Sequence, residues 1–260
     1  MNILVYKFGG TSVADAACLQ RAAAQLATAA SAGYHIVAVV SAQGNTTDKL
    51  VEQARTLTMH PTARELDQLL ASGEQAAASL LAMALEEMGL PVVSLTGRQA
   101  GIHTDGTYGA AEITALHRRR IMKELSDGRI VVVAGFQGCD RSGEINTLGR
   151  GGSDTTAVAL AAALDACGCR ICTDVDGVYD GDPHTGGVHT RYDFLPYSAM
   201  RTMAESGAEV LHPRSVALAE RYRVPVQVQR AGTEQPCTVV GRKEKRRPSR
   251  AADTIFFFRS

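Results

Sequence analysis

Short apolar runs alternate with longer segments of helical composition along most of the chain. The runs are rich in Val and Ile and nearly free of polar residues, which is typical of strands buried on both faces of a parallel sheet. We expect strands at residues 2–6, 35–40, 91–95, 129–134, 170–173 and 224–228. The Ala/Leu-rich segments between them predict helices at 13–32, 63–88, 111–126, 154–166 and 215–222. This alternation predicts an α/β fold, with a mainly parallel sheet and helices on both of its faces.

Four of the predicted strands run directly into turns rich in Gly, Ser and Thr. These turns lie at residues 7–12, 41–47, 96–97 and 135–138. In parallel sheets, ligands bind beyond the carboxyl ends of the strands. The sequence therefore predicts a broad polar site along one edge of the sheet.

Composition narrows the function classes. Lys plus Arg and Asp plus Glu number 27 each, and this zero net charge argues against a nucleic-acid binder that works by bulk electrostatics. No apolar run is long enough to span a bilayer, and the N-terminus lacks the pattern of a signal peptide. We expect a cytoplasmic protein with reduced thiols and with neither a nucleic-acid nor a membrane partner. Cys167, Cys169 and Cys172 are too few for a closed zinc site. Cys169 and Cys172 border a buried strand and are expected to be core residues.

The turn after the first predicted strand carries two adjacent glycines. Its sequence is Lys7-Phe8-Gly9-Gly10-Thr11-Ser12. Paired glycines let backbone N–H groups approach an anion, and a following helix N-terminus adds positive potential. Lys7 can reach the same anion. The pattern is neither a Walker loop nor a dinucleotide fingerprint, and an ordinary tight turn before a helix is the alternative.

A second glycine-rich stretch precedes the predicted helix at 154–166. It reads Gly149-Arg150-Gly151-Gly152-Ser153-Asp154. Ser153 or Asp154 can cap the helix. Arg150 stands among glycines, where a guanidinium can grip a carboxylate with little steric hindrance. The alternative is a capped helix with an exposed Arg.

The segment 173–183 is dense in carboxylates but lacks the ligand spacing and the closing Glu of a calcium loop. A pocket for a nucleotide base and ribose fits better, because Gly177 allows a turn and Tyr179 can flank an apolar ring. Its acidic side chains can accept ribose hydroxyls or hold water on Mg²⁺. Glu74 lies within a predicted helix, where a solvated face is the commoner fate of a Glu.

Taken in chain order, these segments resemble the aspartate kinases of the amino-acid kinase superfamily over about residues 2–241. The matching segments are 7–13, 41–48, 64–67, 73–75, 95–102, 135–138, 147–157, 173–179 and 210–215. The resemblance implies a three-layer αβα sandwich around a central, mainly parallel sheet of about eight strands. It also implies an N-terminal lobe for the amino acid, about 1–145, and a C-terminal lobe for the nucleotide, about 146–241.

The same resemblance implies phosphorylation of the β-carboxylate of L-aspartate to 4-phospho-L-aspartate, with ATP and Mg²⁺. Lys7 would stabilise the transferring phosphoryl group, Asp154 would orient Lys7, and these two with Arg150 would be catalytic. Mg²⁺ would arrive with ATP rather than on side chains. A carboxylate acceptor is already ionised at pH 7, so catalysis needs positioning and charge neutralisation rather than a general base.

Binding roles follow from the resemblance in the same way. Arg150 would clamp the α-carboxylate of the substrate, and Glu74 would receive its ammonium group. The substrate-binding set is Ser41, Thr47, Glu74, Arg150, Gly151, Gly152 and Ser153. The nucleotide-binding set is Lys7, Phe8, Gly9, Gly10, Thr11, Thr173, Asp174, Gly177, Tyr179, Asp182 and His184.

The chain departs from the family in three places. His184 stands where the family usually has Arg, and Glu209 stands where it usually has Lys, so we expect weaker MgATP binding than is usual. The regulatory ACT domains of the family have no counterpart after about residue 241, where a basic and aromatic tail, 242–260, follows. We therefore expect either no feedback inhibition by lysine and threonine or regulation that is borrowed from another subunit.

Two other functions stay open, and the assembly is an expectation. The chain could phosphorylate another small amino or carboxylic acid, or be a weakly active or non-catalytic nucleotide-binding homologue. A homodimer is expected from the resemblance and because twofold dimers are the commonest symmetric assemblies.

Overall fold

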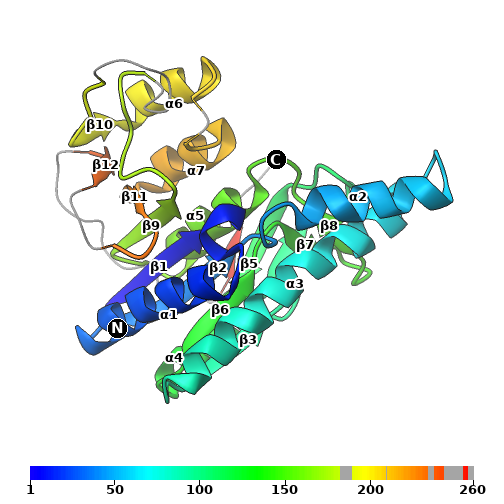
Figure 1. The fold of residues 1–260 in the computed structure, drawn as a ribbon, viewed down its shortest axis with the longest axis horizontal. Coiled ribbons are helices and arrows are strands. Elements are labelled where there is room, and N and C mark those ends of the chain that lie inside the picture. The colour runs from blue at the N-terminus through cyan, green and yellow to red at the C-terminus, as the bar shows by residue number, and fades with distance from the viewer. Residues whose placement is uncertain (182–188, 209, 234–236, 243–253, 257–260) are drawn as a thin grey trace.

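An eight-stranded sheet forms the centre of the protein (Figure 1). The structure, a computed structural model, describes residues 1–181, 189–208, 210–233 and 237–242 and the backbone of 254–256. In sheet order the strands are β10 (Phe194–Pro196), β12 (Thr238–Gly241), β11 (Val226–Arg230), β9 (Gly168–Thr173), β1 (Ile3–Phe8), β2 (His35–Val40), β6 (Ile130–Ala134) and β3 (Val92–Leu95). All neighbours run parallel except β11 and β12. The predicted mainly parallel sheet of about eight strands is confirmed.

Alternation along β1 shows why the sheet is covered on both faces. Leu4, Tyr6 and Phe8 pack in the core shared with α1 (Ala16–Ser31) and α3 (Ala63–Glu87). Ile3 and Val5 point the other way, into the core that includes α5 (Gly152–Ala163). Because successive strand residues face opposite sides, a wholly apolar strand needs helices on both. The three-layer αβα arrangement is therefore confirmed.

The predicted helices are found with one exception. Besides α1, α3 and α5, the structure contains α7, which spans Pro213–Tyr222 and has a proline in its first turn. The segment 111–126, predicted as one helix, instead forms β5 (Ile113–His117) and then α4 (Arg119–Ser126). That prediction was wrong because pairing with β4 overrides the helical composition of this stretch. The structure adds η1 (Gly10–Val13), α2 (Thr46–Leu57) and α6 (Tyr197–Glu205).

A second, five-stranded sheet was not predicted. Its order is β13 (Thr254–Phe256), β5, β4 (Ile102–Thr104), β7 (Gln137–Cys139) and β8 (Ile145–Thr147). Most of these strands have three residues, too few to show a period along the sequence. The backbone of β13 pairs antiparallel with β5, so this part of the predicted tail lies on the domain. Residues 243–253 and 257–260 of that tail lie outside the described residues.

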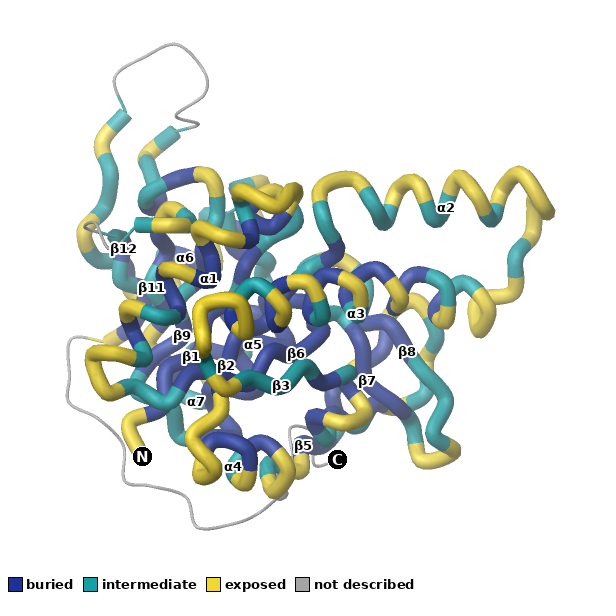
Figure 2. The backbone as a smooth tube through the Cα atoms, turned by 60° about the horizontal axis from the view of Figure 1, so that its bottom comes forward, coloured by how far each residue is buried: buried dark blue, intermediate teal, exposed yellow. Residues whose placement is uncertain are grey.

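Burial is uneven across the molecule. Figure 2 shows a buried central sheet and a projecting α2, which has no buried residue and packs against α3. None of the helices in the described ranges is both long and apolar enough to cross a membrane. The projecting α2 begins directly beyond β2, at the edge of the sheet that the polar turns occupy.

Two neighbouring leucines on α3 test the assignment of its buried face. Leu81 is 0% exposed and Leu80 is 40% exposed. We expect Leu81→Ala to lower the free energy of unfolding by about 2–5 kcal/mol, because it leaves a cavity in the core. Leu80→Ala should lower it by about 1 kcal/mol or less. Urea unfolding of both variants checks this, and equal losses would contradict the orientation of α3.

Candidate active site

Lys7 and Asp154 form an ion pair at the carboxyl edge of the large sheet. Lys7 lies near the end of β1, and Asp154 lies in the first turn of α5. Lys7 Nζ is 2.8 Å from Asp154 Oδ1, and the two side chains are only 14% and 11% exposed. Removing either partner would leave a nearly buried charge without compensation. The pair therefore fixes the start of α5 against the end of β1.

Arg150 lies in a tight turn just before α5. Gly149 and Gly151 have φ of +71° and +68°, in the left-handed region that favours glycine. A Cβ at Gly151 would lie 2.3 Å from the Cβ of His212, so the position also requires the absence of a side chain. Arg150 is exposed, and its guanidinium has no hydrogen bond or ion pair within the described part of the chain.

The predicted capping of α5 by Ser153 or Asp154 was wrong. The helix begins at Gly152, and its N-cap Gly151 provides no side-chain cap. Asp154 is instead drawn to Lys7, a full positive charge that neutralises it better than backbone N–H groups would. Ser153 packs against the turn after β6, since its Oγ lies 2.8 Å from the position of a Cβ on Gly135.

Glu74 is a buried carboxylate on α3, and one of its two oxygens has no hydrogen-bond partner in the described structure. It is 4% exposed, so the alternative of a solvated helix face is wrong. Its Oε1 accepts a hydrogen bond of 3.1 Å from the N–H of Ala42, and its Oε2 has no partner in the described structure. Burial raises the pKa of Glu74 to about 7. Such a group is stabilised as an anion by any cation that reaches it.

The turns after β1 and β2 interlock. The N–H of Gly44 donates to the carbonyl of Gly10 over 3.0 Å, and the N–H of Ser41 donates to the carbonyl of Phe8 over 3.1 Å. A Cβ on Gly9 would lie 3.5 Å from Lys7 Nζ, so the paired glycines do border the Lys7 ammonium. Lys7, Ser41 and Glu74 thus meet along one edge.

Two further residues predicted to bind ligands lie beside these turns, whereas the side chain of a third points away from them. Thr11 is exposed in η1, and Thr47 is half-buried in the first turn of α2. The side chain of Phe8, predicted to bind nucleotide, is 0% exposed and stacks on Tyr6 with ring centroids 6.0 Å apart. The Phe8 ring therefore belongs to the core, because β1 turns it away from the site, and only its backbone lies there.

The segment after β9 is tied together by its own acidic groups. Thr173 donates to Asp174 over 3.0 Å, and the hydroxyl of Tyr179 donates to Asp176 over 2.7 Å. Arg191 donates to the second oxygen of Asp176 over 3.1 Å. These bonds hold the turn, in which Asp174 is exposed and Tyr179 is half-buried.

Other residues of the predicted nucleotide set are buried or not described. Gly177 is buried, and a Cβ there would lie 2.5 Å from Cδ of Arg191. It therefore packs inside the segment and serves its shape. Asp182, His184 and Glu209 lie outside the described residues.

Two residues at this edge were not predicted as functional. Phe136 follows β6 with a φ of +68°, a strained value for a residue with a side chain, and packs against Gly152. His212 caps α7 through a 3.3 Å hydrogen bond from the N–H of Arg214 and packs on Gly151. Burial, and then Arg214, lower the pKa of His212 and favour the neutral imidazole. In the sequence, their segments indicated only a turn and a helix start.

Two of the three clustered cysteines are core residues, and the third, Cys167, is half-buried. Cys169 and Cys172 are 0% exposed in β9, as predicted, and burial raises the pKa of the Cys169 thiol. Within the described ranges, no three His, Cys, Asp or Glu side chains form a group that could hold a metal ion.

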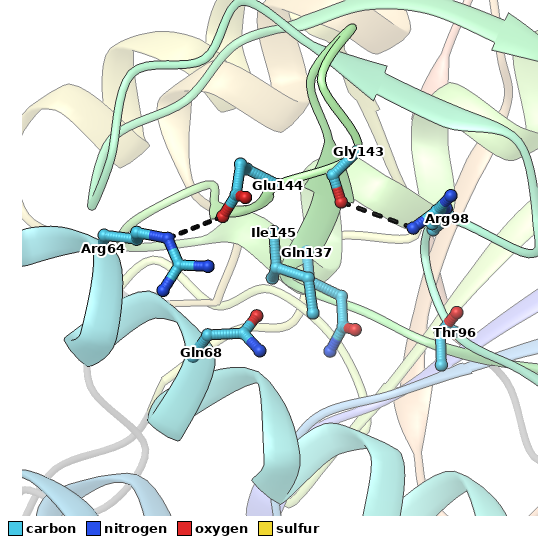
Figure 3. A pocket seen from close by; sticks show the side chains of 8 residues that line it. All are labelled: Arg64, Gln68, Thr96, Arg98, Gln137, Gly143, Glu144 and Ile145. Atoms are coloured by element: carbon cyan, nitrogen blue, oxygen red, sulfur yellow. Dashed lines mark hydrogen bonds and ion pairs between the residues drawn. The ribbon is translucent and has the colours of Figure 1, made fainter.

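A separate cavity of about 230 Å³ lies between the first turns of α3 and the hairpin of β7 and β8 (Figure 3). Its lining residues are Arg64, Gln68, Thr96, Arg98, Gln137, Gly143, Glu144 and Ile145. None of them belongs to the predicted site. Arg64 bridges the cavity from α3 to Glu144 on the hairpin, with a 2.7 Å contact.

The structure is that of an α/β protein whose sheet edge carries two glycine-rich turns and the basic side chains of Lys7 and Arg150. The model of the amino acid kinase family matches residues 2–230. The chain belongs to the amino acid kinase family.

Within this family, the chain is similar to individual aspartokinases. The chain is 48% identical over 240 residues to an aspartokinase of Geobacillus stearothermophilus, covering 92% of this chain and 59% of that protein. It therefore spans about three-fifths of the length of this curated relative. The crystal structure of an aspartate kinase from Synechocystis matches with a TM-score of 0.82 and 41% identity, over 94% of this chain and 40% of that one.

A third relative was solved with bound ligands. The structure of E. coli aspartokinase III in complex with aspartate and ADP matches with a TM-score of 0.82 and 28% identity. The match covers 94% of this chain and 65% of that chain.

The raised pKa of Glu74 predicts a specific dependence of stability on pH. The ordinary value is 4.5 and the folded value is about 7, so the native state binds more protons between these pH values and stability falls as pH rises. Glu74→Gln keeps the acceptor for Ala42 and removes the buried charge. We expect it to raise the free energy of unfolding relative to wild type, by about 2–3 kcal/mol more at pH 8 than at pH 5.

Urea unfolding at pH 5, 6, 7 and 8 measures this difference. Glu86→Gln is the control, because Glu86 is exposed on the same helix and should show no such trend. A difference between Glu74→Gln and wild type that does not change with pH would contradict the assignment.

Proposed function

We propose that this chain transfers the γ-phosphoryl group of ATP to the β-carboxylate of L-aspartate, giving 4-phospho-L-aspartate and ADP. The observation that carries the proposal is a pair of opposite charges that lack partners in the described structure. Glu74 Oε2 is buried without a partner beside the turn after β2, and the Arg150 guanidinium extends from the turn that packs on the end of β6. Strands β2 and β6 are neighbours. An α-amino acid presents the matching ammonium and carboxylate groups.

The proposed chemistry needs little from the protein beyond charge and position. The acceptor carboxylate is ionised at neutral pH, so one of its oxygens attacks phosphorus without a general base. The new P–O bond forms as the bond to the bridging oxygen of ADP breaks, and no proton changes hands. Lys7, held by Asp154, neutralises charge on the transferring group. The backbone of Gly9 and Gly10 is proposed to pass close to the phosphates, with the N–H of Gly9 already donating to the carbonyl of Cys172 over 3.3 Å.

Nucleotide and metal complete the proposal. The exposed edge at Thr173, Asp174 and Tyr179 is proposed to hold the base and ribose. Since the described side chains offer no group of three metal ligands, we propose that Mg²⁺ enters bound to the ATP phosphates. The E. coli relative solved with aspartate and ADP supports both ligand classes for this fold.

The competing reading is a kinase for another small amino or carboxylic acid. It would share Lys7 and the paired glycines and would differ at the residues that meet the acceptor. Buried Glu74 disfavours acids without an amino group, because its ionised form would then lack a counter-charge. The similarity to aspartokinases favours aspartate among the amino acids.

A hydroxamate assay tests the proposal directly. Purified protein is incubated with MgATP, hydroxylamine and aspartate, and acyl phosphate is trapped as aspartyl hydroxamate. We expect product with aspartate and at least about a 100-fold loss of rate in Lys7→Met, since a charge on the transferring group is lost. Glutamate, N-acetylaspartate and succinate are run in parallel.

Each outcome of the assay has one meaning. Product with aspartate supports the proposal. Product only with another acid shows a different acceptor, and no product despite measurable ATP binding shows a non-catalytic homologue. Full activity in Lys7→Met would remove the assigned role of that side chain.

We further propose that the protein acts as a homodimer, in line with the twofold symmetry that most small oligomers adopt. Light scattering coupled to size-exclusion chromatography should give twice the 27.6 kDa mass of the chain. A monomer at micromolar concentration would contradict this.

A further inference from the structure

A buried carboxylate holds the strand that leads into Arg150. Asp67, on α3, is 1% exposed. It accepts hydrogen bonds of 2.7 Å from both the N–H and the hydroxyl of Thr147, at the end of β8. It also accepts from the N–H of Gly109, whose nitrogen lies 3.1 and 3.0 Å from the two carboxylate oxygens. Such multiple donors replace the water that the charge loses on burial.

An arginine also binds the two segments that contain Gly109 and Thr147, through their backbone carbonyl groups. Arg214, in the first turn of α7, donates to the carbonyl of Leu148 over 2.7 Å and to that of Ala111 over 3.1 Å. These acceptors lie one and two residues beyond the groups that Asp67 binds. Asp67 and Arg214 therefore grip the segments 109–111 and 147–148 from α3 and from α7.

Backbone contacts lock the two segments together. The N–H of Ala111 donates to the carbonyl of Thr147 over 2.9 Å, and the N–H of Leu148 donates to the carbonyl of Phe136 over 2.8 Å. A Cβ on Gly149 would lie 2.9 Å from the carbonyl oxygen of Gly109, so the segments touch where the Arg150 turn begins. The residue before Arg150 thus has little freedom to move.

The turn that carries Arg150 needs such an anchor. Gly149 and Gly151 flank it with left-handed backbone, and glycine has more conformational freedom to lose than any other residue. A guanidinium on a loose turn would bind a carboxylate weakly, since binding would have to order the turn first.

We propose that Asp67 and Arg214 are positioning residues that hold the Arg150 turn in the geometry for gripping the acceptor's carboxylate. This inference rests on the proposed function for its kinetic consequence. Neither residue touches a reacting group. Both act through the backbone of 147–149, and the expected signature is weaker acceptor binding with unchanged nucleotide binding.

The other end of β8 provides a contrast along the same strand. Arg64 forms an ion pair with Glu144, directly before β8, as Figure 3 shows. These two side chains are 46% and 35% exposed. Ion pairs this exposed contribute little to the stability of a protein. Glu144→Gln is therefore a control on the same hairpin.

Glu124 supplies a matched control for burial. It has a side chain 4% exposed and accepts from Arg120 and Arg129, on α4 and just beyond it, with no bond to the Arg150 turn. Glu124→Gln removes a buried charge as Asp67→Asn does. It should reduce stability and leave the acceptor KM unchanged.

The test measures steady-state kinetics and hydrogen exchange in the same variants. In Asp67→Asn an amide replaces one acceptor oxygen and faces N–H donors, so we expect the KM for aspartate to rise about 10- to 100-fold. The KM for ATP should stay within about twofold, because no nucleotide group is touched. Amide exchange should speed up at 147–152 and stay unchanged in α4. Arg214→Lys, which keeps the charge and loses the fork, should act in the same direction and serves if Asp67→Asn does not fold.

The outcomes separate this inference from the proposed function. An unchanged aspartate KM in both variants, with an active wild type, would overturn the positioning role. So would equal losses for aspartate and ATP, as from general loosening. If the wild type makes no aspartyl hydroxamate, the proposed function fails, and hydrogen exchange alone decides: faster exchange confined to 147–152 supports the role, and unchanged exchange there overturns it.

Discussion

The ion pair between Lys7 and Asp154 is the interaction on which the site depends. Each charge is too deeply buried to be stable alone, so the end of β1 and the first turn of α5 must meet. That meeting requires the chain to turn sharply before α5, and Gly149 and Gly151 supply the turn in left-handed backbone. Arg150 is the residue placed outward by that turn. One electrostatic contact thus sets the position of a second charge that it does not touch.

The site also contains charge that the folded chain leaves unbalanced. Glu74 is buried with one oxygen that has no partner in the described structure, and burial raises the pKa of Glu74 to about 7. Arg150, exposed at the same edge, is the opposite charge. The proposed zwitterionic substrate would supply the opposite charge to each. In that proposal the buried Glu74 lowers stability and contributes to recognition, as groups at functional sites commonly do.

Helix α3 unites these features. Asp67 and Glu74 lie two helical turns apart on one face of α3. One helix therefore holds β8, which leads into the Arg150 turn, and also supplies the proposed ammonium site. Leu81 and Leu85, further along the helix, are fully buried against the sheet and anchor it. Displacement of α3 would disturb both halves of the acceptor site together.

The sequence by itself determined what depends on local pattern. Its Val- and Ile-rich runs fell in six of the sheet's eight strands. Its glycine-rich turns lay where parallel strands end, so Lys7 and Ser41 could be placed at one edge beforehand. Glu74 and Arg150 were assigned to the same site only through the resemblance to a family. Only the tertiary structure decided which side chains face that edge. It put the Phe8 ring in the core and formed a second sheet from strands too short to show a period. It also decided between two expectations for Asp154, which pairs with Lys7, as the resemblance implied, and does not cap the helix. It also revealed Asp67 and Arg214, whose contacts join residues far apart in the chain. Periodicity reports the neighbours along one element, whereas these contacts arise from how separate elements pack.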